Sequence, residues 1–204
     1  MRVGLTGGIG SGKSEVSRFL ESFGAYIIDT DILAREAVAP NSDGLRQIAR
    51  AWPGVVRGAN LDRGALAEIV FGDPEAREKL NAIVHPHVRR LAQERERFAK
   101  PGQLIVQVVP LLFETGYAAQ CDATILVVSP DDQRIARVLR RDGMAVDRIR
   151  ARMAAQIDPQ AARKLATLVI ENDGQLTHLR ERTRAVFERL TIGRDEGPVR
   201  GAPP

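Results

Sequence analysis

The chain has 204 residues, of which 44% are hydrophobic and 4% aromatic, and its formal net charge is +4. This composition predicts one globular domain with a mostly aliphatic core. The lone Cys121 excludes an intrachain disulfide and a zinc cluster, and no apolar run approaches membrane-spanning length. We therefore expect a cytoplasmic protein without a membrane segment.

A glycine-rich segment near the start of the chain, Gly7–Ser14, fits the phosphate-binding pattern G-x-x-x-x-G-K-[ST]. Its glycines, Gly7, Gly8, Gly10 and Gly12, are expected to take positive φ and to let the backbone approach a polyphosphate. The backbone N–H groups then form an anion-binding nest at a helix N-terminus. Residues 2–6 read as the preceding strand, and apolar residues at helical spacing over 16–23 predict the following helix.

This segment predicts that the chain binds ATP and Mg²⁺. Lys13 is expected to reach the β- and γ-phosphates, and the Ser14 hydroxyl is the predicted metal ligand. The predicted nucleotide contacts in and beside the loop are Gly8, Gly10, Ser11, Gly12, Lys13, Ser14 and Glu15.

A second short strand is predicted over residues 25–28, and it runs into two carboxylates, Asp29 and Asp31. In parallel α/β sheets, ligands bind outside the carboxyl ends of the strands. One carboxylate is therefore expected to accept a proton from a substrate hydroxyl, with Asp31 the preferred base. The alternative is that one of them only caps the helix predicted over residues 32–38.

Residues 40–98 read as a helical lobe in which no strand stands out. Its longest predicted helix begins at Pro74 and contains His85 and Pro86. Proline in a helix interior kinks the helix, and a kink can turn the histidine into a cleft. A satisfied structural histidine is an equally supported alternative.

Two further strands are predicted over residues 103–109 and 123–128, and both lead into polar or arginine-rich segments. The first ends at Pro110, Leu111 and Glu114. The second precedes two arginine-rich helices, which end near Gln156 and read as a lid that closes over phosphates. Its candidates for stabilising transition-state charge are Arg137, Arg141 and Arg152.

The last predicted strand covers residues 168–170 and is followed by Asn172 and an amphipathic helix. Residues 193–204 are polar and rich in glycine and proline, which predicts a disordered tail. The fold class expected from this order is α/β, a P-loop NTPase-type three-layer fold with a five-stranded parallel sheet. We expect one domain over residues 1–192, with a helical substrate lobe inserted at about 32–100 and a helical lid at about 130–160.

Taken in order, seven short motifs resemble those of the dephospho-CoA kinase family over roughly residues 1–190. They are TGGIGSGKS at 6–14, DTDILAR at 29–35, HP at 85–86, PLLFE at 110–114, R-x-x-x-R-D ending at Asp142, R-x-x-x-Q at 152–156 and I-x-N-D-G at 170–174. Their ordered combination is specific, although only the phosphate loop is decisive alone. The chain departs from the family pattern at Val108, Thr167 and Glu15, the last of which is expected to point away along its helix.

The resemblance implies transfer of the ATP γ-phosphate to the ribose 3′-hydroxyl of dephospho-CoA, the last step of coenzyme A synthesis. It places the catalytic aspartate at Asp31, with Lys13, Arg137 and Arg141 as further catalytic residues, and a nucleotide contact at Asn172 and Arg152. The acceptor contacts that it implies are Asp29, Asp31, Arg35, His85, Pro110, Leu111 and Glu114. The implied partners are these small molecules, with no nucleic acid, membrane or obligatory protein partner.

Three other functions remain open at this point. A nucleoside or nucleotide kinase shares the loop, the aspartate and the lid, but the helical lobe with His85 argues against it. A nucleotide-dependent switch is disfavoured because the chain has no Asn-Lys-x-Asp segment. An arginine-driven RNA binder would show RNA affinity that depends steeply on salt.

Overall fold

The computed structural model describes residues 1–192. The predicted tail at 193–204 therefore lies outside the described residues. The described residues form two compact units, one made of residues 1–28 and 100–192, and the other of residues 29–99.

The first unit is built on a five-stranded sheet in the order β2-β5-β1-β6-β7. The strands are β1 (Arg2–Gly7), β2 (Tyr26–Asp29), β5 (Ile105–Val108), β6 (Ala123–Val128) and β7 (Leu168–Glu171). β1 pairs in parallel with β5 and with β6, which places Leu5 opposite both Val108 and Ile125. The predicted five-stranded parallel sheet of an α/β three-layer fold is confirmed.

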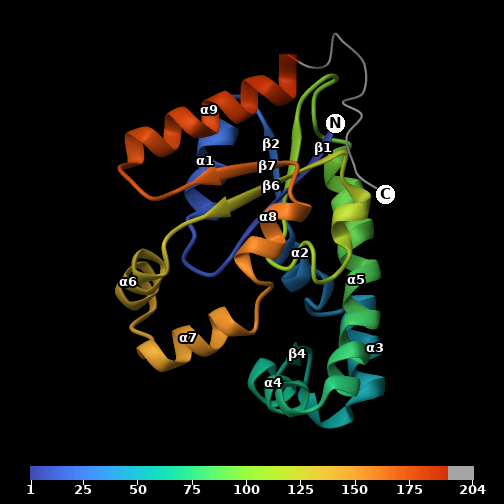
Figure 1. The fold of residues 1–204 in the computed structure, drawn as a ribbon. Coiled ribbons are helices and arrows are strands. Elements are labelled where there is room, and N and C mark those ends of the chain that lie inside the picture. The colour runs from blue at the N-terminus through green and yellow to red at the C-terminus, as the bar shows by residue number, and fades with distance from the viewer. Residues whose placement is uncertain (193–204) are drawn as a thin grey trace. The chain divides into compact units, whose positions relative to one another are not determined.

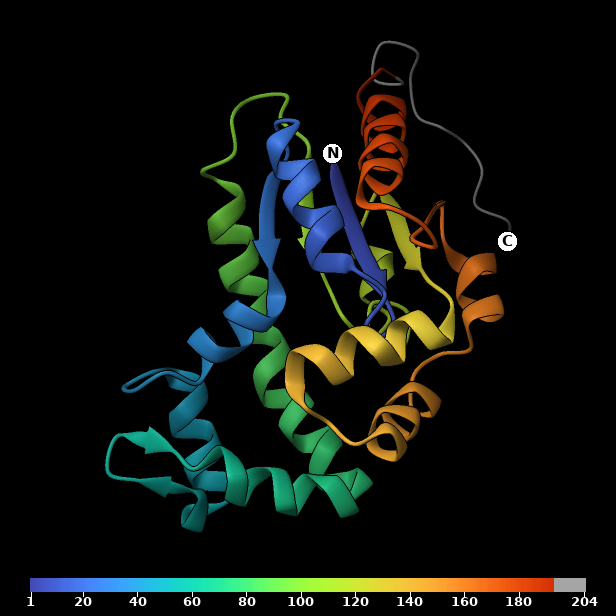
Figure 2. The same ribbon diagram turned by 90° about the vertical axis from the view of Figure 1, so that its left-hand side faces the viewer.

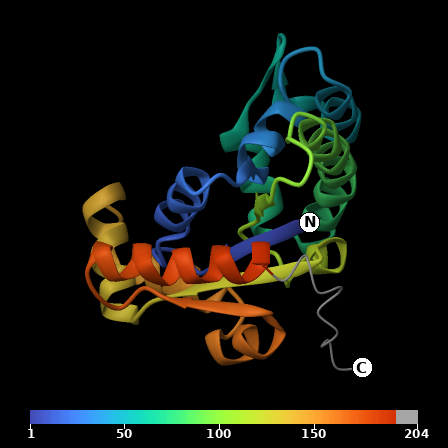
Figure 3. The ribbon, with the colours of Figure 1, turned by 90° about the horizontal axis from the view of Figure 1, so that it is seen from above.

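Helices cover both faces of this sheet (Figure 1). α1 (Lys13–Ser22) packs against α9 (Leu176–Ile192), and α8 (Pro159–Leu165) contacts β6. Seen from above, β7 lies between α9 and α8 (Figure 3). The sheet is buried because its strands are nearly continuous apolar runs, with Val3, Val106 and Val127 fully inaccessible to solvent.

Two helices connect β6 to α8, namely α6 (Asp131–Asp142) and α7 (Val146–Ala154). α6 lies across the end of β1 where the glycine-rich loop begins (Figure 2). A short 3₁₀ turn, η2 (Tyr117–Gln120), precedes β6. α8 was not predicted from the sequence, although Asp158 caps it and Pro159 stands at its first position, which is a common helix start.

The second unit is helical, with α2 (Thr30–Ala37), α3 (Asp43–Ala51), α4 (Arg63–Gly72) and α5 (Pro74–Glu96). Its core gathers Val38, Ile48, Val55 and Leu66, with Trp52 packed against them as a core filler. The expectation that this part lacks strands was wrong, because a turn, η1 (Pro53–Val55), leads into a hairpin of β3 (Val56–Arg57) and β4 (Asn60–Leu61). Strands of two residues are too short to give an alternating pattern. α5 continues as one helix through Pro86.

Among the described residues, no helix has both the length and the apolar character needed to cross a bilayer.

Candidate functional site

The glycine-rich loop joins β1 to α1 and has the backbone conformation of a phosphate nest. Gly10 and Gly12 have φ of 74° and 98°, values that residues with a Cβ rarely adopt. Gly12 directly precedes the first residue of α1, so the N–H groups of the first helical turn face the loop. Positive φ was also expected at Gly8, and that expectation was wrong, since Gly8 is absent from the positive-φ glycines.

Four side chains donate hydrogen bonds to the carbonyl oxygens of this loop, one from within the loop and three from elsewhere in the chain. The donors are Lys13 to Gly7 and to Gly8 (3.1 Å), Arg134 to Ile9 (3.0 Å), Arg137 to Gly10 (3.2 Å) and Asn172 to Ser11 (2.8 Å). A carbonyl that is turned outward leaves the neighbouring N–H groups to form the anion-binding face. Three of the four donors are cationic, which adds positive potential where a polyphosphate is expected.

Asn172 fastens the loop to the end of β7. Its backbone N–H donates to the Val128 carbonyl (2.7 Å), and its side-chain amide donates to the Ser11 carbonyl. A Cβ on Gly12 would lie 2.2 Å from the Asn172 Nδ2, so this approach requires glycine. Asn172 is buried at 7% exposure. The amide predicted as a nucleotide contact is thus engaged with the loop backbone.

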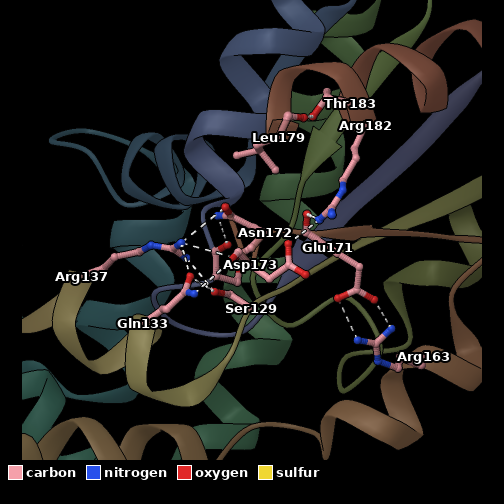
Figure 4. Close-up of polar contacts among 11 residues, drawn as sticks. Ser129, Gln133, Arg137, Arg163, Glu171, Asn172, Asp173, Leu179, Arg182 and Thr183 are labelled. Carbon is pink, nitrogen blue, oxygen red and sulfur yellow. Dashed lines mark hydrogen bonds and ion pairs between the residues drawn. The ribbon is translucent and has the colours of Figure 1, made fainter. Parts of the chain in front are cut away.

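Arg137 lies at the centre of a polar cluster that Figure 4 shows. Its guanidinium donates to the Ser129 hydroxyl (2.8 Å), the Gln133 side-chain oxygen (2.9 Å) and the Asn172 backbone carbonyl (3.3 Å). Gln133 in turn donates to the Asp173 carbonyl (3.0 Å). The cluster joins α6, the loop and the segment after β7.

A neighbouring set of ion pairs joins the last residue of β7, and the segment that follows it, to two helices (Figure 4). Arg163 of α8 donates to both carboxylate oxygens of Glu171 (2.6 and 3.1 Å). Arg182 of α9 donates to the Asp173 carboxylate (2.6 Å), and this hydrogen bond lowers the pKa of that carboxyl.

Arg134 is a site residue that the sequence analysis did not single out. It is buried at 6% exposure, and its guanidinium donates to the Ile9 carbonyl and to the Asp131 carboxylate (2.9 Å). Sequence alone gave no way to rank it among the arginines of α6. Its i, i+3 spacing from Asp131 is the one signal that marks a paired charge.

The other two predicted lid arginines are not among the loop's donors. Arg141 is exposed and hydrogen-bonds to Asp142, which lowers the pKa of that carboxyl. Arg152 is exposed on α7. Their proposed contacts with phosphate stay predictions.

The segment after α7 is docked at two points. The Gln156 side-chain oxygen accepts from the Ile9 N–H (2.8 Å), and the Ile157 N–H donates to the Glu114 carboxylate (3.1 Å). Glu114, predicted as an acceptor contact, therefore anchors the lid segment to the loop that follows β5. Two other acceptor contacts were predicted on the same segment. Pro110 lines a pocket beside the phosphate loop, and Leu111 is 43% exposed.

A pocket of about 730 Å³ opens beside the loop. It is lined by Gly8, Ser11, Arg134, Gln156 and, among others, apolar side chains of β6, α6 and α7. Ser11 is 1% exposed, and its hydroxyl has no hydrogen-bond partner among the described residues. A buried hydroxyl without a partner costs about 1–3 kcal/mol, so it can serve as a donor to a polar ligand.

The first turn of α1 carries the predicted metal ligand. Ser14 is exposed there, and the Glu15 carboxylate pairs with Arg18 one turn later. Glu15 thus points along the helix, as expected. A serine hydroxyl beside a phosphate nest suits Mg²⁺, which keeps several waters and binds through few protein ligands.

The remaining predicted residues belong to the second unit. Asp29 caps α2, and its carboxylate accepts from the N–H groups of Asp31 (2.8 Å) and Ile32 (3.4 Å). Asp31 is exposed in the first turn of α2, and Arg35 in its last turn. The capping alternative therefore applies to Asp29.

His85 lies in the middle of α5, with its pKa below the ordinary value because burial, and secondarily the Arg89 charge, disfavours the protonated form.

Comparisons with known proteins agree over nearly the whole chain. The family model for dephospho-CoA kinase matches residues 1–178. The dephospho-CoA kinase of Moorella thermoacetica is 42% identical over 207 residues, covering 99% of this chain and 98% of the relative. That of Thermus thermophilus is 42% identical over 196 residues, covering 96% of this chain and 94% of the relative.

Solved structures show the same fold. The crystal structure of TT1252 from Thermus thermophilus matches with a TM-score of 0.83 at 41% identity, covering 94% of this chain and 98% of that chain. A shikimate kinase from Acinetobacter baumannii matches with a TM-score of 0.56 at 14% identity, covering 95% of this chain and 94% of that one, which is a likeness of fold alone.

Proposed function

This chain belongs to the dephospho-CoA kinase family, and on that premise we propose that it transfers the γ-phosphate of ATP to the ribose 3′-hydroxyl of dephospho-CoA. The observation that carries the proposal is the loop of Gly7–Ser14, whose carbonyl oxygens accept hydrogen bonds from Lys13, Arg134, Arg137 and Asn172. Such a loop is shaped to bind a polyphosphate rather than a neutral ligand.

In phosphoryl transfer the protein positions the reactants and neutralises charge that spreads over the transferred group. Lys13 approaches the β- and γ-phosphates from the loop, and Ser11 offers its hydroxyl. Arg134 and Arg137 contribute positive potential from behind the loop. These four groups supply electrostatic stabilisation that needs little rearrangement during the reaction.

Asp31 is the proposed general base. Because Asp29 already caps α2, the carboxylate two residues later is the better placed of the two to accept the proton of the 3′-hydroxyl. The rest of the second unit, with Arg35 and His85, is proposed to hold the acceptor. Each of these roles rests on the family resemblance, and those of Asp31 and Arg35 rest also on their exposure within that unit.

Ser14 is the proposed Mg²⁺ ligand. When bound, the ion neutralises charge on the phosphates and orients them. Ser14 presents one hydroxyl at the first turn of α1, and Glu15 is directed toward Arg18 instead. We place the enzyme in the cytoplasm with small-molecule substrates, because a chain with a single cysteine suits a reducing compartment.

The direct test is to detect coenzyme A by mass after incubating the purified chain with ATP, Mg²⁺ and dephospho-CoA. We expect one coenzyme A per ADP, and little ADP when the acceptor is left out. ADP release that does not depend on the acceptor would instead support a nucleotide-dependent switch. Product from nucleosides but not from dephospho-CoA would replace the proposed acceptor.

The proposed role of Asp31 as general base is tested with Asp31→Asn, which keeps the shape of the side chain and removes most of its basicity. We expect ATP affinity to stay within about twofold and kcat to fall by on the order of 10²–10⁴. Asp147→Asn, at an exposed position of α7, is the matched control. Loss of ATP binding in Asp31→Asn would move this residue to a metal-binding or structural role.

A further inference from the structure

The peptide groups on both sides of Ile9 are held by side chains of the lid. Arg134, from α6, donates to the Ile9 carbonyl at 3.0 Å, and Gln156, just after α7, accepts from the Ile9 N–H at 2.8 Å. These two residues lie 125 and 147 positions away along the chain. Ile9 is the third residue of the phosphate loop Gly7–Ser14, between Gly8 and Gly10, so the lid fixes the orientation of both of its peptide groups.

The glycine at position 8 is explained by the close approach of these two lid side chains. Its backbone is not in the left-handed region, so positive φ does not explain why this position is a glycine. A Cβ at Gly8 would lie 2.3 Å from Nη2 of Arg134 and 3.2 Å from Oε1 of Gln156. The missing side chain makes room for the two lid residues that hold Ile9.

The end of the lid that contains Gln156 has a second attachment, and this attachment restricts the position of the Gln156 side chain. The Ile157 N–H donates to Glu114 on the segment that follows β5. Gln156 therefore stands between two attachments, one to the phosphate loop through its own side chain and one to the strand-end segment through the next residue. Rotation of its side chain away from Ile9 would leave an N–H of the loop without this acceptor.

We propose that Gln156 is a positioning residue for phosphoryl transfer, which fixes the Ile9 peptide and thereby the shape of the phosphate loop. The inference rests on the proposed kinase function but adds a role that the phosphate-loop motif does not contain. Because the Gln156 side chain accepts the hydrogen bond of the Ile9 N–H, it affects ATP binding through the shape of the loop. Loop shape is needed in the ground state and in the transition state alike, so its loss weakens ATP binding more than it slows the chemical step.

The test compares Gln156→Met with Gln160→Met. Methionine keeps the length of glutamine and removes the acceptor oxygen, and Gln160 is an exposed position four residues further on. For Gln156→Met we expect KM and Kd for ATP to rise by about five- to tenfold, the effect of one lost hydrogen bond. We expect kcat to fall by less than about threefold and KM for dephospho-CoA to stay unchanged, while Gln160→Met matches the wild type in all four constants.

Three results would overturn the proposal. Unchanged ATP constants with only a lower melting temperature would make Gln156 purely structural. A lower KM for ATP would mean that Gln156 competes with the nucleotide for the loop. A kcat that falls by more than the rise in KM would give Gln156 a role in the transition state instead.

A double-mutant cycle with Gly8→Ala gives a second readout should Gln156→Met fold poorly. A Cβ on Gly8 would displace the side chains of both Arg134 and Gln156, so Gln156→Met should add less than about twofold to the ATP KM of Gly8→Ala. Fully additive effects would refute the shared contact. Isothermal titration with ATP needs no acceptor, so it tests this inference even if the wild type forms no coenzyme A, which would refute only the proposed function.

Discussion

Asn172→Ala is the change that most directly tests how the loop is held. It removes the amide that donates at 2.8 Å to the Ser11 carbonyl, while the backbone bond from residue 172 to Val128 remains. Ser11 is 1% exposed, so its carbonyl would lose a buried partner. Leaving a buried acceptor unpaired costs about 1–3 kcal/mol. For a chain of this size, each kcal/mol lowers the melting temperature by roughly 2–4 °C.

The same change should loosen the loop and raise the KM for ATP by about tenfold, close to 1.4 kcal/mol of lost binding. Guanidinium titrations give the stability, and initial rates with ATP and with GTP give the two KM values. A loop role raises both KM values by the same factor, whereas a base-reading role changes their ratio. Asn81→Ala, at an exposed position of α5, is the control.

Asn172 does not hold the loop if Asn172→Ala lowers the free energy of unfolding by less than about 0.5 kcal/mol and keeps the wild-type KM for ATP. If Asn172→Ala changes only the ratio of the KM for ATP to the KM for GTP, Asn172 contacts the nucleotide, as predicted from the sequence.

Three further predictions concern other parts of the molecule. Gly8→Ala should raise the ATP KM by about tenfold because its Cβ would clash with the lid, whereas Gly54→Ala, which meets no atom within 4 Å, should leave the kinetics unchanged. Because burial lowers the pKa of His85, the unfolded chain binds this proton more readily, so stability should fall as pH drops through the ordinary value of 6.5. Midpoints of denaturant unfolding at several pH values should show that the loss of stability with falling pH is smaller in His85→Gln and unchanged in His178→Gln. Lys13→Ala should lower kcat/KM for coenzyme A formation by on the order of 10²–10⁴, and wild-type turnover would remove Lys13 from the chemistry.

Much of the fold was predictable because its signals are local. The apolar runs gave the five strands, and a proline after Asp73 marked the start of α5 at Pro74. The hairpin of β3 and β4 was missed since its strands have two residues each. α8 was missed although its capping residue and first proline were present, because its seven residues carry no long apolar stripe.

The candidate site divides in the same way. The loop of Gly7–Ser14 was predictable because glycine, lysine and serine at fixed spacing have a local physical role. The contacts of Arg134 and Gln156 were not. Nothing near Arg134 distinguishes it from the other arginines of the lid, and the R-x-x-x-Q motif that contains Gln156 does not indicate that its partner is Ile9. Positive φ was expected at Gly8 because local reasoning offers no other need for a glycine. The actual need is the close approach of Arg134 and Gln156, which lie more than a hundred positions away in the sequence.

The sequence by itself determined the phosphate loop, the succession along the chain of the five sheet strands and of the helices other than α8, and through their motifs the family to which the chain belongs. Only the tertiary structure decided that Arg134, Arg137, Asn172 and Gln156 hold the loop, and that Arg141 pairs with its own neighbour instead. The physical reason is that hydrogen bonds and steric contacts act over about 3 Å. Which distant residues come within that range depends on how the sheet and its helices pack.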